Sequence, residues 1–129
     1  MQRRVVIAAS GSGVLGAIRR ALAAAGFVVA AEAVDARSAF AAVARERPDA
    51  VVFDSDLPGG ALVAAAAIAT PGDPPPVLVL DEGGTDPRLR AAELAGASGY
   101  LSGPLDGDRL ADAVVDLLRT TDSHRREEK

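Results

Sequence analysis

The feature that most constrains the fold is an alternation, repeated five times, of short apolar runs with segments of helical periodicity. The apolar runs predict strands over Arg4–Ala9, Phe27–Ala33, Ala50–Phe53, Val77–Leu80 and Gly99–Leu101. The periodic segments predict helices over Val14–Ala25, Ala36–Arg47, Ala61–Ala69, Asp86–Ala95 and Asp106–Arg119. Runs this apolar are typical of strands buried on both faces, so the sequence predicts a doubly wound α/β domain with a parallel sheet.

The length of the chain fits one such domain. It has 129 residues, of which 49% are hydrophobic, enough for a core. We expect residues 1–119 to form the domain. Residues 120–129 contain no apolar residue, so we predict a charged tail or linker without fixed structure.

Composition excludes several classes of site. The absence of cysteine rules out disulfides, thiolate catalysis and zinc–sulfur centres. The single histidine, His124, lies among charges in the tail, where no catalytic triad can be built around it. A net charge of −4 argues against nucleic-acid binding by this domain alone, and no apolar run reaches the length of about 18 residues needed for a membrane span. We therefore expect a cytoplasmic protein that is not an enzyme.

Binding residues in an open α/β sheet lie at the carboxyl ends of the strands. The residues predicted at those ends are Ala9 and Ser10, then Asp54, then Asp81 and Glu82, and finally Ser102 and Gly103. Their identities decide what the domain can do.

Two segments carry a family resemblance. The run from Pro48 to Gly59, Pro-Asp-Ala-Val-Val-Phe-Asp-Ser-Asp-Leu-Pro-Gly, resembles the strand–Asp–x–x–(Met/Leu)–Pro–Gly segment of response-regulator receiver domains. The run Gly96–Leu101, Gly-Ala-Ser-Gly-Tyr-Leu, is similar to the fifth strand of receivers that precede LuxR-type (NarL/FixJ-like) DNA-binding domains. The resemblance extends from about Arg3 to Arg119 and implies a flavodoxin-like fold with strand order 2-1-3-4-5.

The resemblance also assigns positions in a mechanism. It places Asp54 as the phosphoacceptor and Tyr100 as the aromatic switch residue. In the family, an acidic pair after the first strand joins the acceptor Asp in holding Mg²⁺. A Thr or Ser after the fourth strand and a Lys after the fifth strand contact the phosphate and move the aromatic residue.

Four of these positions depart from the family pattern. Ala9 and Ser10 replace the acidic pair, Asp81 replaces the Thr or Ser, and Gly103 replaces the Lys. One carboxylate of three remains, so we expect Mg²⁺ binding to be weak or absent. At the position of Asp81, the Thr or Ser of the family donates a hydrogen bond to the phosphoryl group. Asp81 has a negative charge there instead, and this charge would repel the phosphoryl group. A metal site rebuilt from Asp54 and Asp81 is a weaker alternative.

These departures predict an atypical receiver that acts as a signalling or regulatory protein-interaction module, independently of aspartyl phosphorylation. Its partner would be another protein or a second copy, through the side formed by the fourth helix, fifth strand and fifth helix. There we expect Arg88 and Arg90 to face a helix that bears Asp112 and Asp116. The alternative within the family, a receiver that still accepts phosphate at Asp54, remains open.

A rival signal lies between the first strand and the first helix. Gly11–Gly16 matches the G-x-G-x-x-G pattern of dinucleotide-binding loops, and Glu32 follows it by about 20 residues. A nucleotide-binding module is therefore a second alternative. In a softer form, Gly11, Ser12 and Gly13 are a loop at a helix N-terminus that would suit a small anionic ligand.

Overall fold

The computed structural model describes residues 2–69, 72–82 and 96–127, without the side chains of residues 124–127. Within these ranges the chain forms one sheet of five parallel strands in the order β2-β1-β3-β4-β5. The strands are β1 (Arg4–Ala8), β2 (Val28–Ala33), β3 (Ala50–Asp54), β4 (Val77–Asp81) and β5 (Gly99–Ser102). The strand order and the flavodoxin-like fold that the sequence predicts are confirmed.

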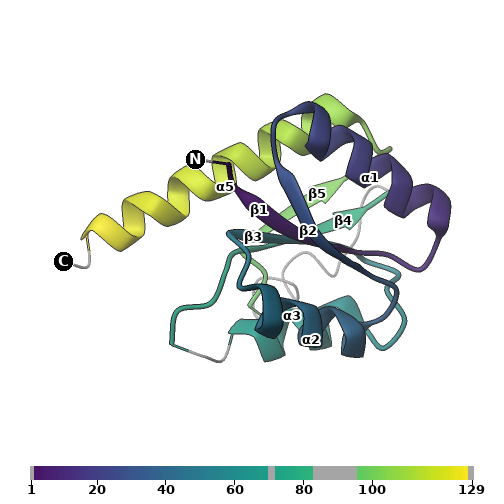
Figure 1. Cartoon of the computed structure of the whole chain (residues 1–129), viewed down its shortest axis with the longest axis horizontal. Coiled ribbons are helices and arrows are strands. Elements are labelled where there is room, and N and C mark those ends of the chain that lie inside the picture. Colours follow the sequence, from purple (N-terminus) through teal and green to yellow (C-terminus); the bar gives the residue numbers. More distant parts are fainter. Residues whose placement is uncertain (1, 70–71, 83–95, 128–129) are drawn as a thin grey trace.

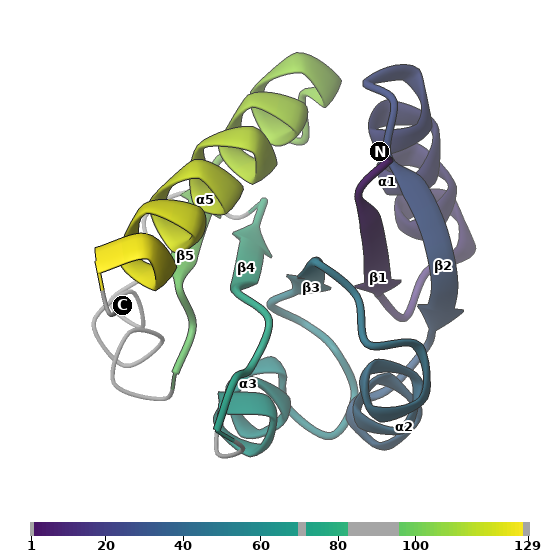
Figure 2. The same ribbon diagram turned by 60° about the vertical axis from the view of Figure 1, so that its left-hand side comes forward.

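Helices cover both faces of the sheet (Figures 1 and 2). Those described are α1 (Ser12–Ala24), α2 (Ala36–Glu46), α3 (Ala61–Ala69) and α5 (Gly107–Glu127). Helices α1 and α5 lie against one face and α2 and α3 against the other, as Figure 2 shows. The helix predicted over residues 86–95 lies outside the described residues. Of the other predicted helices, α3 has the predicted bounds, α1 and α2 differ from them by one or two residues at an end, and α5 extends well beyond its predicted end at Arg119.

Two apolar layers, one on each face of the sheet, make up the core. Alternate residues of a strand point to opposite faces. In β4, Val77 and Val79 pack with the α2–α3 layer, whereas Leu78 and Leu80 pack with the α1–α5 layer. This alternation fixes which face each residue at the end of a strand will join.

Acidic side chains define the first turns of two helices. The Asp35 carboxylate accepts a hydrogen bond from the backbone N–H of Ser38 at 2.8 Å and caps α2. The hydroxyl and the backbone N–H of Ser38 both lower the pKa of Asp35. Asp106 accepts from the backbone N–H of Asp108 at 2.9 Å, so it caps α5 and marks the predicted start of that helix.

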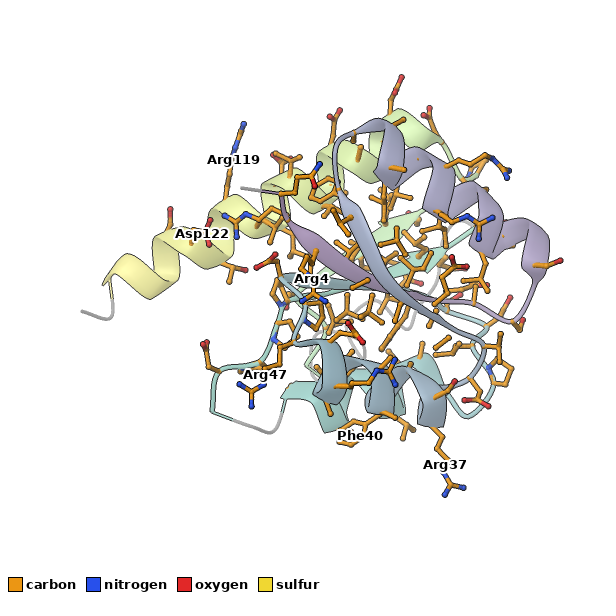
Figure 3. All side chains as sticks on the ribbon, in the orientation of Figure 1. Arg4, Arg37, Phe40, Arg47, Arg119 and Asp122 are labelled. Atoms are coloured by element: carbon orange, nitrogen blue, oxygen red, sulfur yellow. The ribbon has the colours of Figure 1, made fainter. Side chains whose placement is uncertain are left out.

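The prediction of an unstructured tail is wrong for residues 120–127, because α5 continues to Glu127. The hydroxyls of Thr120 and Thr121 donate to the carbonyl oxygens of Asp116 and Leu117 within the helix. Asp122, labelled in Figure 3, forms an ion pair with Arg3 at 2.6 Å. A low content of apolar residues suggested disorder, but a helix that is already nucleated continues more easily than it starts, and Asp122 gains a contact with Arg3. None of the described helices is both long and apolar enough to cross a membrane.

Candidate functional site

The carboxyl-terminal edge of the sheet brings together most of the site residues that the sequence predicts. Asp54 ends β3 and Asp81 ends β4, which is the neighbouring strand. In the register of β4 with β5, Asp81 lies beside Ser102 and Val79 lies beside Tyr100. Strands β3, β4 and β5 therefore place Asp54, Asp81 and Tyr100, respectively, towards the same end of the sheet.

Asp81 lies at the centre of this group. It is 7% exposed and is the one polar or charged residue that counts as buried among those described. The Tyr100 hydroxyl donates a hydrogen bond to Asp81 Oδ2 at 2.7 Å. The Ser55 hydroxyl donates a longer one to Oδ1 at 3.5 Å. A buried carboxylate needs such donors, because it has left the water that would otherwise solvate it.

The contact between Tyr100 and Asp81 follows from the strand alternation. Tyr100 lies beside Val79, and Asp81 follows Val79 by two residues on the same face of the sheet. The Tyr100 ring packs against the α2–α3 layer. Its hydroxyl therefore reaches along the face to the end of β4. Sequence reasoning selected both residues but missed this hydrogen bond, since the register between β4 and β5 was the information it lacked.

Asp54 occupies a less favourable environment for a carboxylate. Burial raises its pKa above the ordinary value, and the negative charges of Asp56 and Asp81 act in the same direction. The backbone N–H groups of Asp56 and Ser55 oppose this effect. The Asp56 N–H donates to Asp54 Oδ1 at 3.4 Å, a long hydrogen bond. The residue at the phosphoacceptor position is thus flanked by like charge.

The positions of the family's acidic pair hold no carboxylate. Ala9 is fully buried, and its methyl group belongs to the apolar layer beneath α1 and α5. Ser10 is exposed to solvent. Within the described part of the chain, no three His, Cys, Asp or Glu side chains come together in a way that could hold a metal ion. The residues present therefore do not fit the Mg²⁺ site of the family.

Gly103 stands where the family carries its lysine. Its φ is +100°, in a region that residues with a side chain rarely adopt. Its backbone N–H donates to the carbonyl oxygen of Asp81 at 2.8 Å. The backbone at this position is therefore shaped for glycine, and it ties the loop after β5 to the end of β4.

The glycine-rich segment after β1 forms a simple strand-to-helix connection. Gly11 is the N-cap of α1, with φ −98° and no side-chain cap hydrogen bond. Gly11, Gly13 and Gly16 do not have positive φ, unlike Gly103. Glu32, the acidic residue of the rival dinucleotide pattern, is held by Arg19 through contacts of 2.9 and 3.0 Å. The acid that would bind a ribose is thus engaged in an ion pair.

The predicted dimer side is described only in part. Arg88 and Arg90 lie outside the described residues. Asp112 and Asp116 are exposed on α5.

Comparisons with known proteins agree with this architecture. Residues 5–115 match the family model of the response regulator receiver domain. The chain is 36% identical over 118 residues to the transcriptional regulatory protein PrrA of Mycobacterium tuberculosis, covering 90% of this chain and 50% of PrrA. PrrA of Mycobacterium leprae is 34% identical over the same length. The chain thus spans about half the length of the curated relatives it matches.

Solved structures show the same fold. The signal receiver domain of NarL from Mycobacterium tuberculosis superposes with a TM-score of 0.85 at 26% identity, covering 92% of this chain and 97% of that one. The chemotaxis response regulator CheY4 of Vibrio cholerae superposes with a TM-score of 0.80 at 21% identity, covering 91% and 99%. The second likeness concerns the fold alone.

Proposed function

Because this chain belongs to the response regulator receiver domain family of two-component signalling, we propose that it is an atypical receiver whose state is not set by aspartyl phosphorylation. It acts as a protein-interaction module. Receivers of transcriptional regulators are generally signalling modules without enzymatic activity, and we propose the same of this one.

The observation that carries the proposal is the buried carboxylate of Asp81 beside Asp54. Burial raises the pKa of Asp54, and the negative charge of Asp81 raises it further. A phosphoryl group on Asp54 would bring a charge of about −1.5 to −2 into the same environment. The family places a neutral hydroxyl donor at this point, whereas Asp81 presents a carboxylate that is itself an acceptor. Repulsion therefore opposes the modification that the family uses as its signal.

The remaining pocket positions offer no compensation. Ala9 contributes a buried methyl group where a metal ligand would be needed, and Gly103 contributes no side-chain cation. Mg²⁺ prefers several oxygen ligands in octahedral geometry, so we expect it to bind weakly or not at all. Without Mg²⁺ or lysine, the charge that develops during phosphoryl transfer would have little to stabilise it.

The module would signal through its surface. The relatives it matches are transcriptional regulatory proteins about twice as long as this chain. We propose that this domain serves a regulator of that kind in the cytoplasm and leaves nucleic-acid binding to another part of the protein. Its partner would be a protein or a second copy that meets the side of the domain that carries β5 and α5.

Phosphoryl transfer from small donors tests the proposal. The protein is incubated with acetyl phosphate or phosphoramidate and Mg²⁺, and its intact mass is measured. We expect no gain of a phosphoryl group, while a receiver with the full set of family residues gains one under the same conditions. A gain that Asp54→Asn abolishes would favour the alternative, a receiver that accepts phosphate at Asp54.

A small anionic ligand at the start of α1 is a second candidate function. The N-cap Gly11 provides no side-chain acceptor for the first-turn N–H groups, so these groups are available to an anion near Ser12 and Gly13. Calorimetry with inorganic phosphate, nucleotides and carboxylate metabolites tests this. Binding heat that Gly13→Pro removes would support the candidate, and no heat with any of them would reject it. NAD(H) titrated in parallel tests the dinucleotide alternative.

A further inference from the structure

We propose that Asp81 is a positioning residue for the signalling surface, because its carboxylate holds the Tyr100 hydroxyl inside the domain without any phosphoryl group. This inference rests on the proposed function, since it concerns what sets the state of the receiver in place of phosphorylation. The contact between Asp81 and Tyr100 takes the place of the contacts that the hydroxyl and lysine side chains make in the family.

The geometry of the contact suits a strong hydrogen bond. The Tyr100 hydroxyl lies 2.7 Å from Asp81 Oδ2. Hydrogen bonds from a hydroxyl to an ionised carboxylate have lengths of about 2.5–2.7 Å and are about twice as strong as neutral ones. A Thr or Ser at residue 81 would offer only a neutral partner. The carboxylate therefore holds the ring more firmly than the usual residue could.

The anchor is itself fixed from two sides. The backbone N–H of Gly103 donates to the carbonyl oxygen of Asp81 at 2.8 Å, which joins the loop after β5 to β4. The backbone N–H of Ser55 donates to the carbonyl oxygen of Leu80 at 2.7 Å, which joins the loop after β3 to β4. The Ser55 hydroxyl also reaches Asp81 Oδ1 at 3.5 Å. The ends of β3, β4 and β5 thus form one connected network around the carboxylate.

This network sets what a partner meets on β5. Strand β5 lies at the edge of the sheet, next to β4, and is followed by α5 (Figure 2). With its hydroxyl on Asp81, the half-buried Tyr100 ring packs against the α2–α3 layer. Releasing the hydroxyl would free the ring to leave this layer and change the surface along β5 on the α2–α3 face of the sheet. Asp81 therefore favours the inward position of the Tyr100 ring in the unmodified chain.

The chain provides its own probe for this inference. It contains one tyrosine and no tryptophan, so intrinsic fluorescence reports on Tyr100 alone. The experiment measures quenching of that emission by acrylamide in the wild-type chain, Asp81→Ala and Asp81→Thr. Thr restores the family residue and suits a strand, so it keeps the test valid if the Ala variant fails to fold. Circular dichroism establishes that each variant is folded.

We expect both Asp81 variants to expose the ring. Loss of one charge-assisted hydrogen bond should shift the ratio of inward to outward ring by about tenfold, seen as a higher quenching constant. The control is Asp56→Asn, which removes an exposed carboxylate from the same edge and should leave quenching unchanged. Folded Asp81 variants whose quenching equals that of the wild type would overturn the inference.

The same samples separate this inference from the proposed function. Each is treated with acetyl phosphate and Mg²⁺ and analysed by mass as well as by quenching. A phosphoryl group on Asp54 of the wild type would overturn the proposed function, yet a rise in quenching in the Asp81 variants would still support the anchor. Unmodified Asp54 combined with unchanged quenching in those variants would overturn the anchor alone.

Discussion

Charged side chains have different partners at the two ends of the parallel strands. At the amino-terminal edge, Arg3 pairs with Asp122 at 2.6 Å and lies 3.8 Å from Asp49, and Arg4, labelled in Figure 3, pairs with Glu46 at 2.8 Å. Here Arg3 and Arg4 each meet a carboxylate. At the carboxyl-terminal edge, the Asp81 carboxylate accepts from hydroxyl groups, and the environment of Asp54 disfavours its ionised form.

The ion pairs at the amino-terminal edge connect parts of the fold, whereas the carboxylates at the carboxyl-terminal edge occupy the position of the family's phosphorylation pocket. The pairs at the amino-terminal edge are partly exposed, so each contributes little, but they join the first strand to the ends of α2 and α5. At the opposite edge, burial and the neighbouring negative charges disfavour the ionised form of Asp54. A cost of this kind is typical of functional edges in α/β domains. The carboxyl-terminal edge is therefore the part of the molecule for which we propose a role in signalling.

Restoring the family's carboxylate at residue 9 should produce the largest effect. Ala9 is fully buried, so Ala9→Asp places a charge in the apolar layer and should reduce the free energy of unfolding by about 3–5 kcal/mol. Urea denaturation measures this. The matched control is Ser10→Asp, an exposed neighbour that should change stability by less than about 0.5 kcal/mol.

Repeating both measurements with Mg²⁺ sharpens the comparison. If the pocket no longer fits the metal, millimolar Mg²⁺ leaves the Ala9→Asp deficit in place. Recovery of most of the lost stability would mean that residues 9, 54 and their neighbours still assemble a metal site, and the contrast between the two edges would weaken.

The sequence predicted the sheet well because its strands are buried on both faces. The run Ala50–Phe53 was predicted as a strand, and β3 extends it by one residue to Asp54. A short apolar run of this kind indicates a buried strand from the local sequence alone. The extension of α5 through residues 120–127 was missed, because its stability comes from helix propagation and a contact with Arg3, 119 residues away.

The sequence predicted which residues lie at the site, but it did not predict the contacts between them. The family pattern identified Asp54, Asp81, Tyr100 and Gly103, and all four lie at the predicted edge. The hydrogen bond between Tyr100 and Asp81 depends on the register of β4 with β5, which no local pattern encodes. The sequence therefore presented Asp81 only as a repulsive charge, whereas the structure also makes it an acceptor.

Breaking the pair of Arg3 and Asp122 should have a smaller effect, confined to one region. A double-mutant cycle with Arg3→Ala and Asp122→Ala should give a coupling of about 0.2–1 kcal/mol, as expected for a partly exposed pair. Hydrogen exchange should be faster over residues 120–127 in either variant, because the contact holds that part of α5. The outcome that contradicts the role is unchanged exchange there, which would mean that helix propagation alone orders the segment.

Replacing Asp54 by Asn should give the smallest effect, and its sign is set by pH. Burial and neighbouring carboxylates raise the pKa of Asp54 in the folded chain, so the ionised form costs stability above that pKa. Asp54→Asn should therefore melt at a higher temperature than the wild type at pH 7. The difference should shrink as the pH falls through the folded pKa towards the unfolded value of about 3.9.

The control for this prediction has the opposite sign. Hydrogen bonds from Ser38 lower the pKa of Asp35, so its ionised form stabilises the fold. Asp35→Ala should melt at a lower temperature than the wild type at pH 7, and the loss should diminish as the pH falls below the ordinary pKa of aspartate. Thermal melts of the three proteins between pH 7 and about pH 2 measure both trends. If Asp54→Asn also lost stability at pH 7, the Asp54 carboxylate would be held by favourable contacts, and the carboxyl-terminal edge would resemble the amino-terminal one.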